Sequence, residues 1–181
     1  MFLNKYHHLK NKEIYILIFL IIFSILIRIP AVLIFGDTSL ENEWKDIVNN
    51  LIKNGELLYR GAPNLFMPPL YAFYLYFFSI FKLEGQNYIL LILLSQVLLS
   101  SISVAVLYKL NKLFFSHKLS FYSSLLFSLF PLYIYASTQI SSINLQVFLT
   151  IIFFFYFFEF KKKKNFLTIC LFSLTGGLLI L

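Results

Sequence analysis

Six long apolar runs dominate this sequence and limit what it can fold into. The runs cover residues 14–35, 68–82, 87–108, 119–138, 142–158 and 166–181. A helix rises about 1.5 Å per residue, so about twenty apolar residues cross the ~30 Å hydrocarbon core of a bilayer. The runs are continuous, whereas the strands of a membrane β-barrel alternate between apolar and polar residues. We therefore predict an all-α integral membrane protein.

Charged residues are scarce and stand mostly at the flanks of the apolar runs. They make up 13% of the 181 residues, whereas about a quarter of an average soluble domain is charged. The formal net charge of +7 comes largely from lysines next to the runs, where positive charge sets the orientation of membrane helices. We therefore predict a membrane as the partner of this chain, and no nucleic acid.

Three lysine-rich segments predict the topology: the tail before residue 14 and the loops 109–118 and 159–165. The run 68–82 is about 22 Å long, which is too short to cross a bilayer. If it does not cross, all three lysine-rich segments face the cytoplasm, as the positive-inside rule requires. We therefore predict a cytoplasmic N-terminus and an external loop over residues 36–86. The five predicted membrane helices are 14–35, 87–108, 119–138, 142–158 and 166–181.

The predicted external loop contains two short helices. Apolar residues recur at helical spacing from Leu40 to Ile52, and Gly55 is a typical helix stop. This segment is amphipathic, and we expect it to lie flat on the membrane with Trp44 among the lipid headgroups. The run 68–82 forms the second, interfacial or re-entrant helix. It begins at two prolines, which the first turn of a helix tolerates.

Half of the carboxylates of the chain stand within ten residues at the start of this loop. The chain has eight acidic residues, and four of them are Asp37, Glu41, Glu43 and Asp46. A carboxylate can act as a general base toward a hydroxyl group, and several together suit a divalent cation as cofactor. The structural alternatives are a capping box from Thr38 to Glu41 and a solvated helix face at Glu43.

A series of short motifs resembles one family of membrane enzymes. The motifs are Arg28, Gly36-Asp37, Glu43-Trp44, Asn50-Leu51, Met67-Pro68-Pro69-Leu70-Tyr71, Phe130-Pro131 and Ser141-Ser142-Ile143-Asn144-Leu145. In order and spacing, residues 10–181 resemble the N-terminal portion of the bacterial membrane glycosyltransferases of the C-type fold, the protein-mannosyltransferase-like group. No single motif carries this resemblance; it rests on the series as a whole.

The resemblance implies a function and a location. Members of this group take a sugar from a polyprenyl-phosphate-linked donor and transfer it on the external face of the bacterial plasma membrane. We expect the acceptor to be a glycan, a lipid or a protein. Members also carry an essential acid in the first external loop, and amphipathic helices between the first and second spans. This arrangement agrees with the topology that the charges predict.

The resemblance implies that the catalytic acid is Asp37, Glu41 or Glu43. In the family the acid stands three or four residues before the aromatic residue, where this chain has Leu40 and Glu41, so the choice among the three stays open. Many members carry another acid in a later external loop, but this chain has none between residues 84 and 159. We therefore assign no metal-binding residues.

Three further residues are candidates for substrate binding. Arg28 and Arg60 suit a lipid phosphate, because a guanidinium group can bind two phosphate oxygens at once. The alternatives are that Arg28 extends its charge to the membrane interface, and that Arg60 is a surface charge. Trp44 is the third candidate, beside its expected place among the headgroups.

Two other functions are alternatives to glycosyl transfer. A transporter or a lipid-flipping subunit would place polar groups inside its spans, and apart from Arg28 the apolar runs contain only uncharged ones such as Gln96, Asn144 and Gln146. This favours chemistry at the external surface. The run 166–181 is only about 24 Å long, and we expect the chain to be the N-terminal part of a longer protein, inactive by itself. An inactive, truncated remnant is the other alternative.

Overall fold

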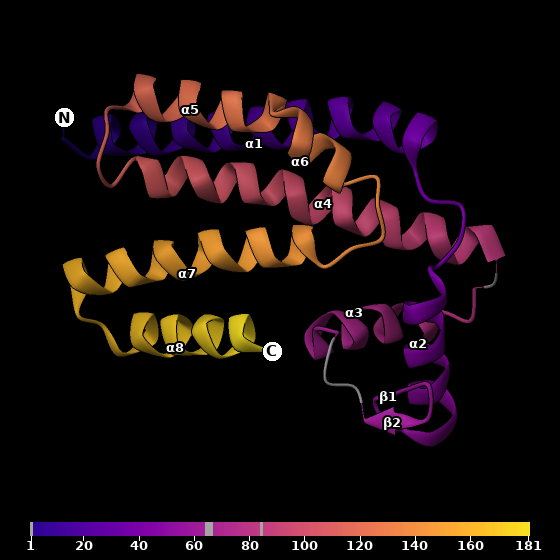
Figure 1. The fold of residues 1–181 in the computed structure, drawn as a ribbon. Coiled ribbons are helices and arrows are strands. Elements are labelled where there is room, and N and C mark those ends of the chain that lie inside the picture. Colours follow the sequence, from indigo (N-terminus) through magenta and orange to yellow (C-terminus); the bar gives the residue numbers. More distant parts are fainter. Residues whose placement is uncertain (1, 64–66, 84) are drawn as a thin grey trace.

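The computed structural model describes residues 2–63, 67–83 and 85–181, and most of them are helical (Figure 1). The elements are α1 (Phe2–Phe35), α2 (Asn42–Asn54), β1 (Leu58–Tyr59), β2 (Ala62–Pro63), α3 (Pro69–Ser79), α4 (Gly85–Asn111), α5 (His117–Leu129), α6 (Pro131–Ala136), α7 (Ile143–Lys163) and α8 (Phe166–Ile180). The two short strands pair antiparallel. The predicted all-α membrane fold is confirmed.

Five helices pack along one another in alternating directions, in the order α1, α4, α5, α7 and α8 along the chain (Figure 1). Helix α4 is central and contacts α1, α5 and α7, and α8 packs on α7. Among the residues that the structure describes, three segments are long and apolar enough to cross a membrane, namely Lys12–Phe35, Gly85–Asn111 and Ile143–Lys162. Helix α8 is apolar but shorter. That five segments cross remains a prediction.

The run 119–138, which we predicted as one membrane helix, is divided into α5 and α6. The division falls at Phe130, whose φ of −67° and ψ of 118° are not helical. The next residue, Pro131, lacks an N–H group and sterically disfavours the helical conformation of the residue before it. The chain therefore turns at this point, and α6 departs from the direction of α5 (Figure 1).

Helix α2 has the predicted amphipathic face but buries it against protein. Its buried residues are Trp44, Ile47, Val48 and Leu51, and the first three join a core that also contains residues of α1, α3 and α4. Trp44 is 5% exposed and packs edge-on against Tyr71 of α3, with ring centroids 4.9 Å apart. The expectation that Trp44 lies among lipid headgroups is therefore wrong, because α3 covers that face of α2.

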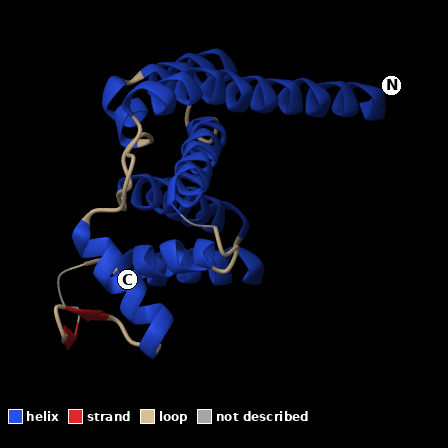
Figure 2. Cartoon of the chain, turned by 90° about the vertical axis from the view of Figure 1, so that its right-hand side faces the viewer, coloured by secondary structure: helices blue, strands red, loops and turns tan. Residues whose placement is uncertain are grey.

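Helix α2 ends, and helix α3 begins, where the sequence predicts. Gly55 follows α2 with a left-handed φ of 71°, and its N–H donates to the carbonyl of Leu51. Helix α3 begins at Pro69, directly after Pro68. It has 11 residues, about 17 Å of helix, which is too short to cross a bilayer. Figure 2, which looks at this end of the molecule, shows the small hairpin at its outer edge.

Candidate active site at the acidic end of the bundle

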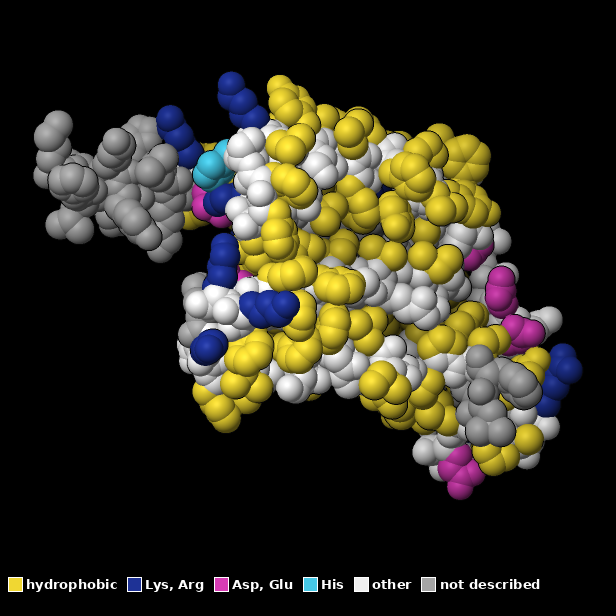
Figure 3. All heavy atoms as spheres, turned by 60° about the vertical axis from the view of Figure 1, so that its left-hand side comes forward, with side chains coloured by type: hydrophobic (Ala, Val, Ile, Leu, Met, Phe, Trp, Pro, Cys, Tyr) yellow, Lys and Arg dark blue, Asp and Glu magenta, His cyan; other side chains and the backbone are white. Residues whose placement is uncertain are grey.

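The charged side chains divide between the two ends of the bundle. In Figure 3, most of the lysine side chains in view lie at one end, and most of the acidic ones lie at the other. The lysine end contains the loops after α4 and α7, which carry the predicted cytoplasmic clusters. The acidic end contains α2, α3 and the segment from Asp37 to Glu56. The candidate catalytic acids therefore share one end of the molecule.

Asp37 is anchored at this end by a loop that is distant in sequence. Its backbone N–H donates to the carbonyl of Thr138, at 3.0 Å. Its side-chain Oδ2 accepts a hydrogen bond from the backbone N–H of Ile140, at 2.6 Å. Nearby, the amide of Gln139 donates to the carbonyl of Phe35, the last residue of α1, at 3.1 Å. The loop between α6 and α7 thus fixes the position of this carboxylate.

A small hollow of about 320 Å³ opens beside Asp37, lined also by Gly36, Asn87 and side chains of α1 and α4. Gly36 is required at the base of this hollow for a steric reason. A Cβ atom at this position would lie 2.3 Å from the carbonyl oxygen of Val32. The glycine therefore lets the chain leave α1 closely enough to place Asp37 against the loop before α7.

The other acids of the cluster contact the hairpin or face solvent. Asp46 accepts a hydrogen bond from the backbone N–H of Arg60, at 2.8 Å, and Arg60 has a left-handed φ of 51°. Glu43 accepts a longer one, 3.4 Å, from the hydroxyl of Tyr59. Glu41 is exposed and is itself the residue that precedes α2, without a side-chain capping bond. The capping box predicted from Thr38 to Glu41 is therefore not formed.

The three candidate acids thus do not converge on one point. In the described part of the chain, no group of three His, Cys, Asp or Glu side chains could hold a metal ion. Asp37 is bound to the loop before α7, whereas Glu43 faces the hairpin beyond α2. We therefore derive no chemical step through a divalent cation.

A chain of buried hydrogen bonds supports the loop that holds Asp37. Asn144, at the start of α7, donates to the carbonyl of Ala136, at 2.7 Å, and to the side-chain oxygen of Gln96, at 3.1 Å. Gln96 in turn donates to the hydroxyl of Tyr71, at 2.7 Å. Burial, followed by the neighbouring Tyr74 and Asp37, raises the pKa of Tyr71 well above its ordinary value, so its phenol stays neutral.

The sequence presents Gln96 and Asn144 only as isolated polar residues in apolar runs, and we did not include them among the site residues. The signal that could have found them is the cost of an unpaired amide inside a membrane protein. That cost requires each amide to find a partner, and here each partly satisfies the other.

Arg28 lies in the interior of the bundle and is fully buried. Its Nε donates to the hydroxyl of Ser100 at 2.8 Å, and its Nη1 donates to the hydroxyl of Ser24. Nη1 also donates to the carbonyl of Ser128 at 3.3 Å, which is available because α5 ends one residue later. Arg28 thus neither extends to the membrane interface nor forms an ion pair with any acid in the described part of the chain.

The two other predicted substrate-binding residues lie apart from Arg28. Arg60 is exposed at the turn of the hairpin, with its guanidinium over the ring of its neighbour Tyr59, 5.1 Å from the centroid. Trp44 is enclosed between α2 and α3, as described above. The structure therefore does not bring the three together into one phosphate-binding group.

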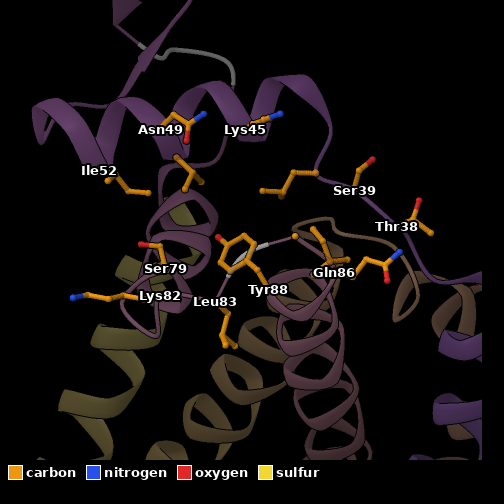
Figure 4. A pocket seen from close by; sticks show the side chains of 14 residues that line it. Thr38, Ser39, Lys45, Asn49, Ile52, Ser79, Lys82, Leu83, Gln86 and Tyr88 are labelled. Atoms are coloured by element: carbon orange, nitrogen blue, oxygen red, sulfur yellow. The ribbon is translucent and has the colours of Figure 1, made fainter.

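A second hollow, of about 730 Å³, lies between α2 and the segment that joins α3 to α4 (Figure 4). Lys45 and Asn49 of α2 line one side, and Lys82 and Leu83 line the other. This hollow and the smaller one beside Asp37 share three lining residues, Thr38, Gln86 and Ile89. None of the three candidate acids lines the larger hollow.

The fold and the site define a polytopic helical membrane protein with an anchored carboxylate at one polar end. The family model described as dolichyl-phosphate-mannose-protein mannosyltransferase matches residues 56–180. The chain therefore belongs to this family and is a membrane glycosyltransferase of the mannosyltransferase type, as the motifs predicted. The match begins after the acidic cluster. No curated protein and no solved structure matches the chain.

Proposed function

We propose that this protein transfers a sugar from a polyprenyl-phosphate-linked donor to a hydroxyl group of an acceptor, on the external face of a bacterial plasma membrane. The family supports a lipid-linked sugar donor and a membrane setting. The observation that carries the proposal is the anchoring of Asp37, at the acidic end of the bundle and beside a hollow. The first donor to test is polyprenyl-phosphate mannose.

Asp37 is the general base in this proposal. One of its carboxylate oxygens is held by Ile140, and no hydrogen bond from the described residues engages the other, Oδ1. Oδ1 takes the proton of the acceptor hydroxyl, whose oxygen forms a bond to the anomeric carbon of the sugar. The bond from that carbon to the phosphate oxygen breaks, and the lipid phosphate leaves with the electron pair. A fixed carboxylate suits this role, because general bases act from a defined position within hydrogen-bond reach.

The orientation follows from the distribution of charge. Loops on the cytoplasmic side of a membrane carry an excess of Lys and Arg. The lysine-bearing loops after α4 and α7 lie together at the end of the bundle opposite to the end of α1, which Asp37 follows (Figure 1). This supports a cytoplasmic N-terminus and transfer on the external side, where lipid-linked sugars meet their acceptors.

The test is sugar transfer by membranes that contain the protein expressed from its own gene. A general base contributes roughly 10²–10⁴-fold to rate, so Asp37→Asn is expected to lose at least ~100-fold of the transfer from radiolabelled polyprenyl-phosphate mannose. Glu41→Gln and Glu43→Gln test the two other candidates. The control is Asp46→Asn, which keeps an oxygen that can accept the bond from Arg60 and should retain most activity.

Membrane expression is measured for every variant, so that a loss of protein is not read as a loss of chemistry. If Glu41→Gln or Glu43→Gln abolishes transfer while Asp37→Asn does not, the base is assigned to the wrong acid. If all three variants keep more than about a tenth of the activity, each loss is smaller than the smallest loss expected for a general base. In that case the cluster is structural and the proposal fails.

A further inference from the structure

The larger hollow, between α2 and the segment that joins α3 to α4, combines cationic and aliphatic side chains. Lys45 and Lys82 lie on opposite sides of it (Figure 4). In the described part of the chain, neither ammonium group forms an ion pair or a side-chain hydrogen bond. Between them the wall carries aliphatic side chains, among which Ile52 and Leu83 are 52% and 40% exposed.

We propose that this hollow binds the phosphate headgroup and adjoining carbons of an anionic membrane phospholipid. Lys45 and Lys82 attract the phosphate, and the amide of Asn49 donates to its oxygens. Ile52 and Leu83 cover the first apolar carbons of the lipid. The proposal concerns a bilayer lipid and does not depend on glycosyl transfer or on the assignment of the base.

The height of the hollow in the bundle supports a lipid ligand. It opens beside Gly85 and Gln86, at the start of α4. Helix α4 is long and apolar enough to cross a membrane. When α4 crosses, its first residues lie at the level of the lipid headgroups. Exposed aliphatic side chains and amines together at this level fit a lipid, whose headgroup and chains meet there.

The charges around the hollow support an anionic lipid. The nearest acids of α2, Glu43 and Asp46, lie on the other flank of the helix and contact the hairpin through Tyr59 and Arg60. They are not among the side chains that line the hollow. The apolar part of the wall is mostly aliphatic, with Tyr88 as an aromatic member.

The test is the chemical modification of lysines in the 181-residue chain reconstituted into vesicles. The vesicles contain phosphatidylcholine alone or phosphatidylcholine with phosphatidylglycerol, and a membrane-impermeant acetylating reagent is followed by peptide mass spectrometry. Lys53 is the internal control, because it is on the same helix and exposed but does not line the hollow. We expect phosphatidylglycerol to slow acetylation of Lys45 and Lys82, relative to Lys53, by about fivefold, the factor for one lysine near an anionic headgroup.

Three other outcomes overturn the proposal. Equal slowing at Lys53 means a diffuse surface field and no site. Equal protection by inorganic phosphate, without phosphatidylglycerol, means a site for free phosphate. Protection by polyprenyl phosphate as a minor component, which phosphatidylglycerol does not reproduce, means a site for the substrate lipid.

A second measurement uses variants and does not rely on modification. Native mass spectrometry of the chain with phosphatidylglycerol should show a retained lipid, and Lys45→Gln/Lys82→Gln should lower its occupancy well below that of Lys53→Gln. The three lysines are exposed, so these variants are expected to fold. Equal lipid retention by the double variant and the Lys53→Gln control contradicts the proposal.

Discussion

At the scale of single residues, Arg28 shows how a charge can be kept inside a membrane protein without an acidic partner. Its Nε and Nη1 donate to hydroxyl groups of α4 and α1 and to a carbonyl at the end of α5, whereas Nη2 has no hydrogen-bond partner among the described residues. The carboxyl end of a helix carries a partial negative charge, so the interruption of α5 provides part of the counter-charge. Three helices are thereby tied to one side chain.

These hydrogen bonds assign Arg28 a structural role. A substitution can distinguish this role from the binding of a lipid phosphate. Lysine keeps the charge but has no planar fork, so Arg28→Lys cannot satisfy Ser24, Ser100 and the carbonyl of Ser128 together. Each lost bond to a charged group costs about 1.5–3 kcal/mol. We expect a lower thermal midpoint for unfolding of the purified protein, with an unchanged KM for the donor. A raised KM at unchanged stability would instead identify Arg28 as a phosphate ligand.

At the scale of elements, the end of α1 positions the proposed base. Gly36 allows the chain to leave the helix while its N–H still donates to the carbonyl of Val32, at 2.8 Å. Asp37 then meets the loop before α7. The spacing between the last turn of α1 and the carboxylate is therefore set by a residue without a side chain.

Gly36→Ala should consequently impair sugar transfer, although Gly36 itself has no role in the chemistry. The added Cβ would clash with the carbonyl of Val32, so the end of α1 and Asp37 must shift, and a displacement of about 1 Å can cost ~100-fold in rate. Gly177→Ala is the matched control, because its added Cβ has no described atom within 4 Å apart from its chain neighbours and the backbone of its own helix. Both variants are compared by transfer assay and membrane expression. Full activity of Gly36→Ala would mean that the position of Asp37 is not critical.

The elements also show what the sequence can and cannot predict. The long apolar runs correctly predict α1, α4 and α7, and Gly55 correctly predicts the end of α2, because these features depend on neighbouring residues. The burial of Trp44 could not be predicted, since it depends on α3 packing over α2. The partners of Arg28, Gln96 and Asp37 lie 72, 48 and 103 residues away along the chain. No local pattern specifies such pairings.

At the scale of the whole molecule, the separation of charge between the two ends makes orientation measurable. A cysteine replaces Glu56 or Lys118, both exposed and at opposite ends, in a chain that carries Cys170→Ser to remove its one native thiol. A membrane-impermeant maleimide applied to intact cells is expected to label the first position and not the second. Labelling of the second only after the cells are permeabilised is the control for its accessibility. The reverse pattern would invert the proposed topology.

The bond between Asp37 and Ile140 has a consequence for biosynthesis. The acid is synthesised 103 residues before the residue that holds it. At a translation rate of about 5–20 residues per second, the interval is roughly 5–20 s. During this time the carboxylate of Asp37 has no anchor. The order of synthesis thus delays the fixing of Asp37, the proposed base, until the loop before α7 has been synthesised.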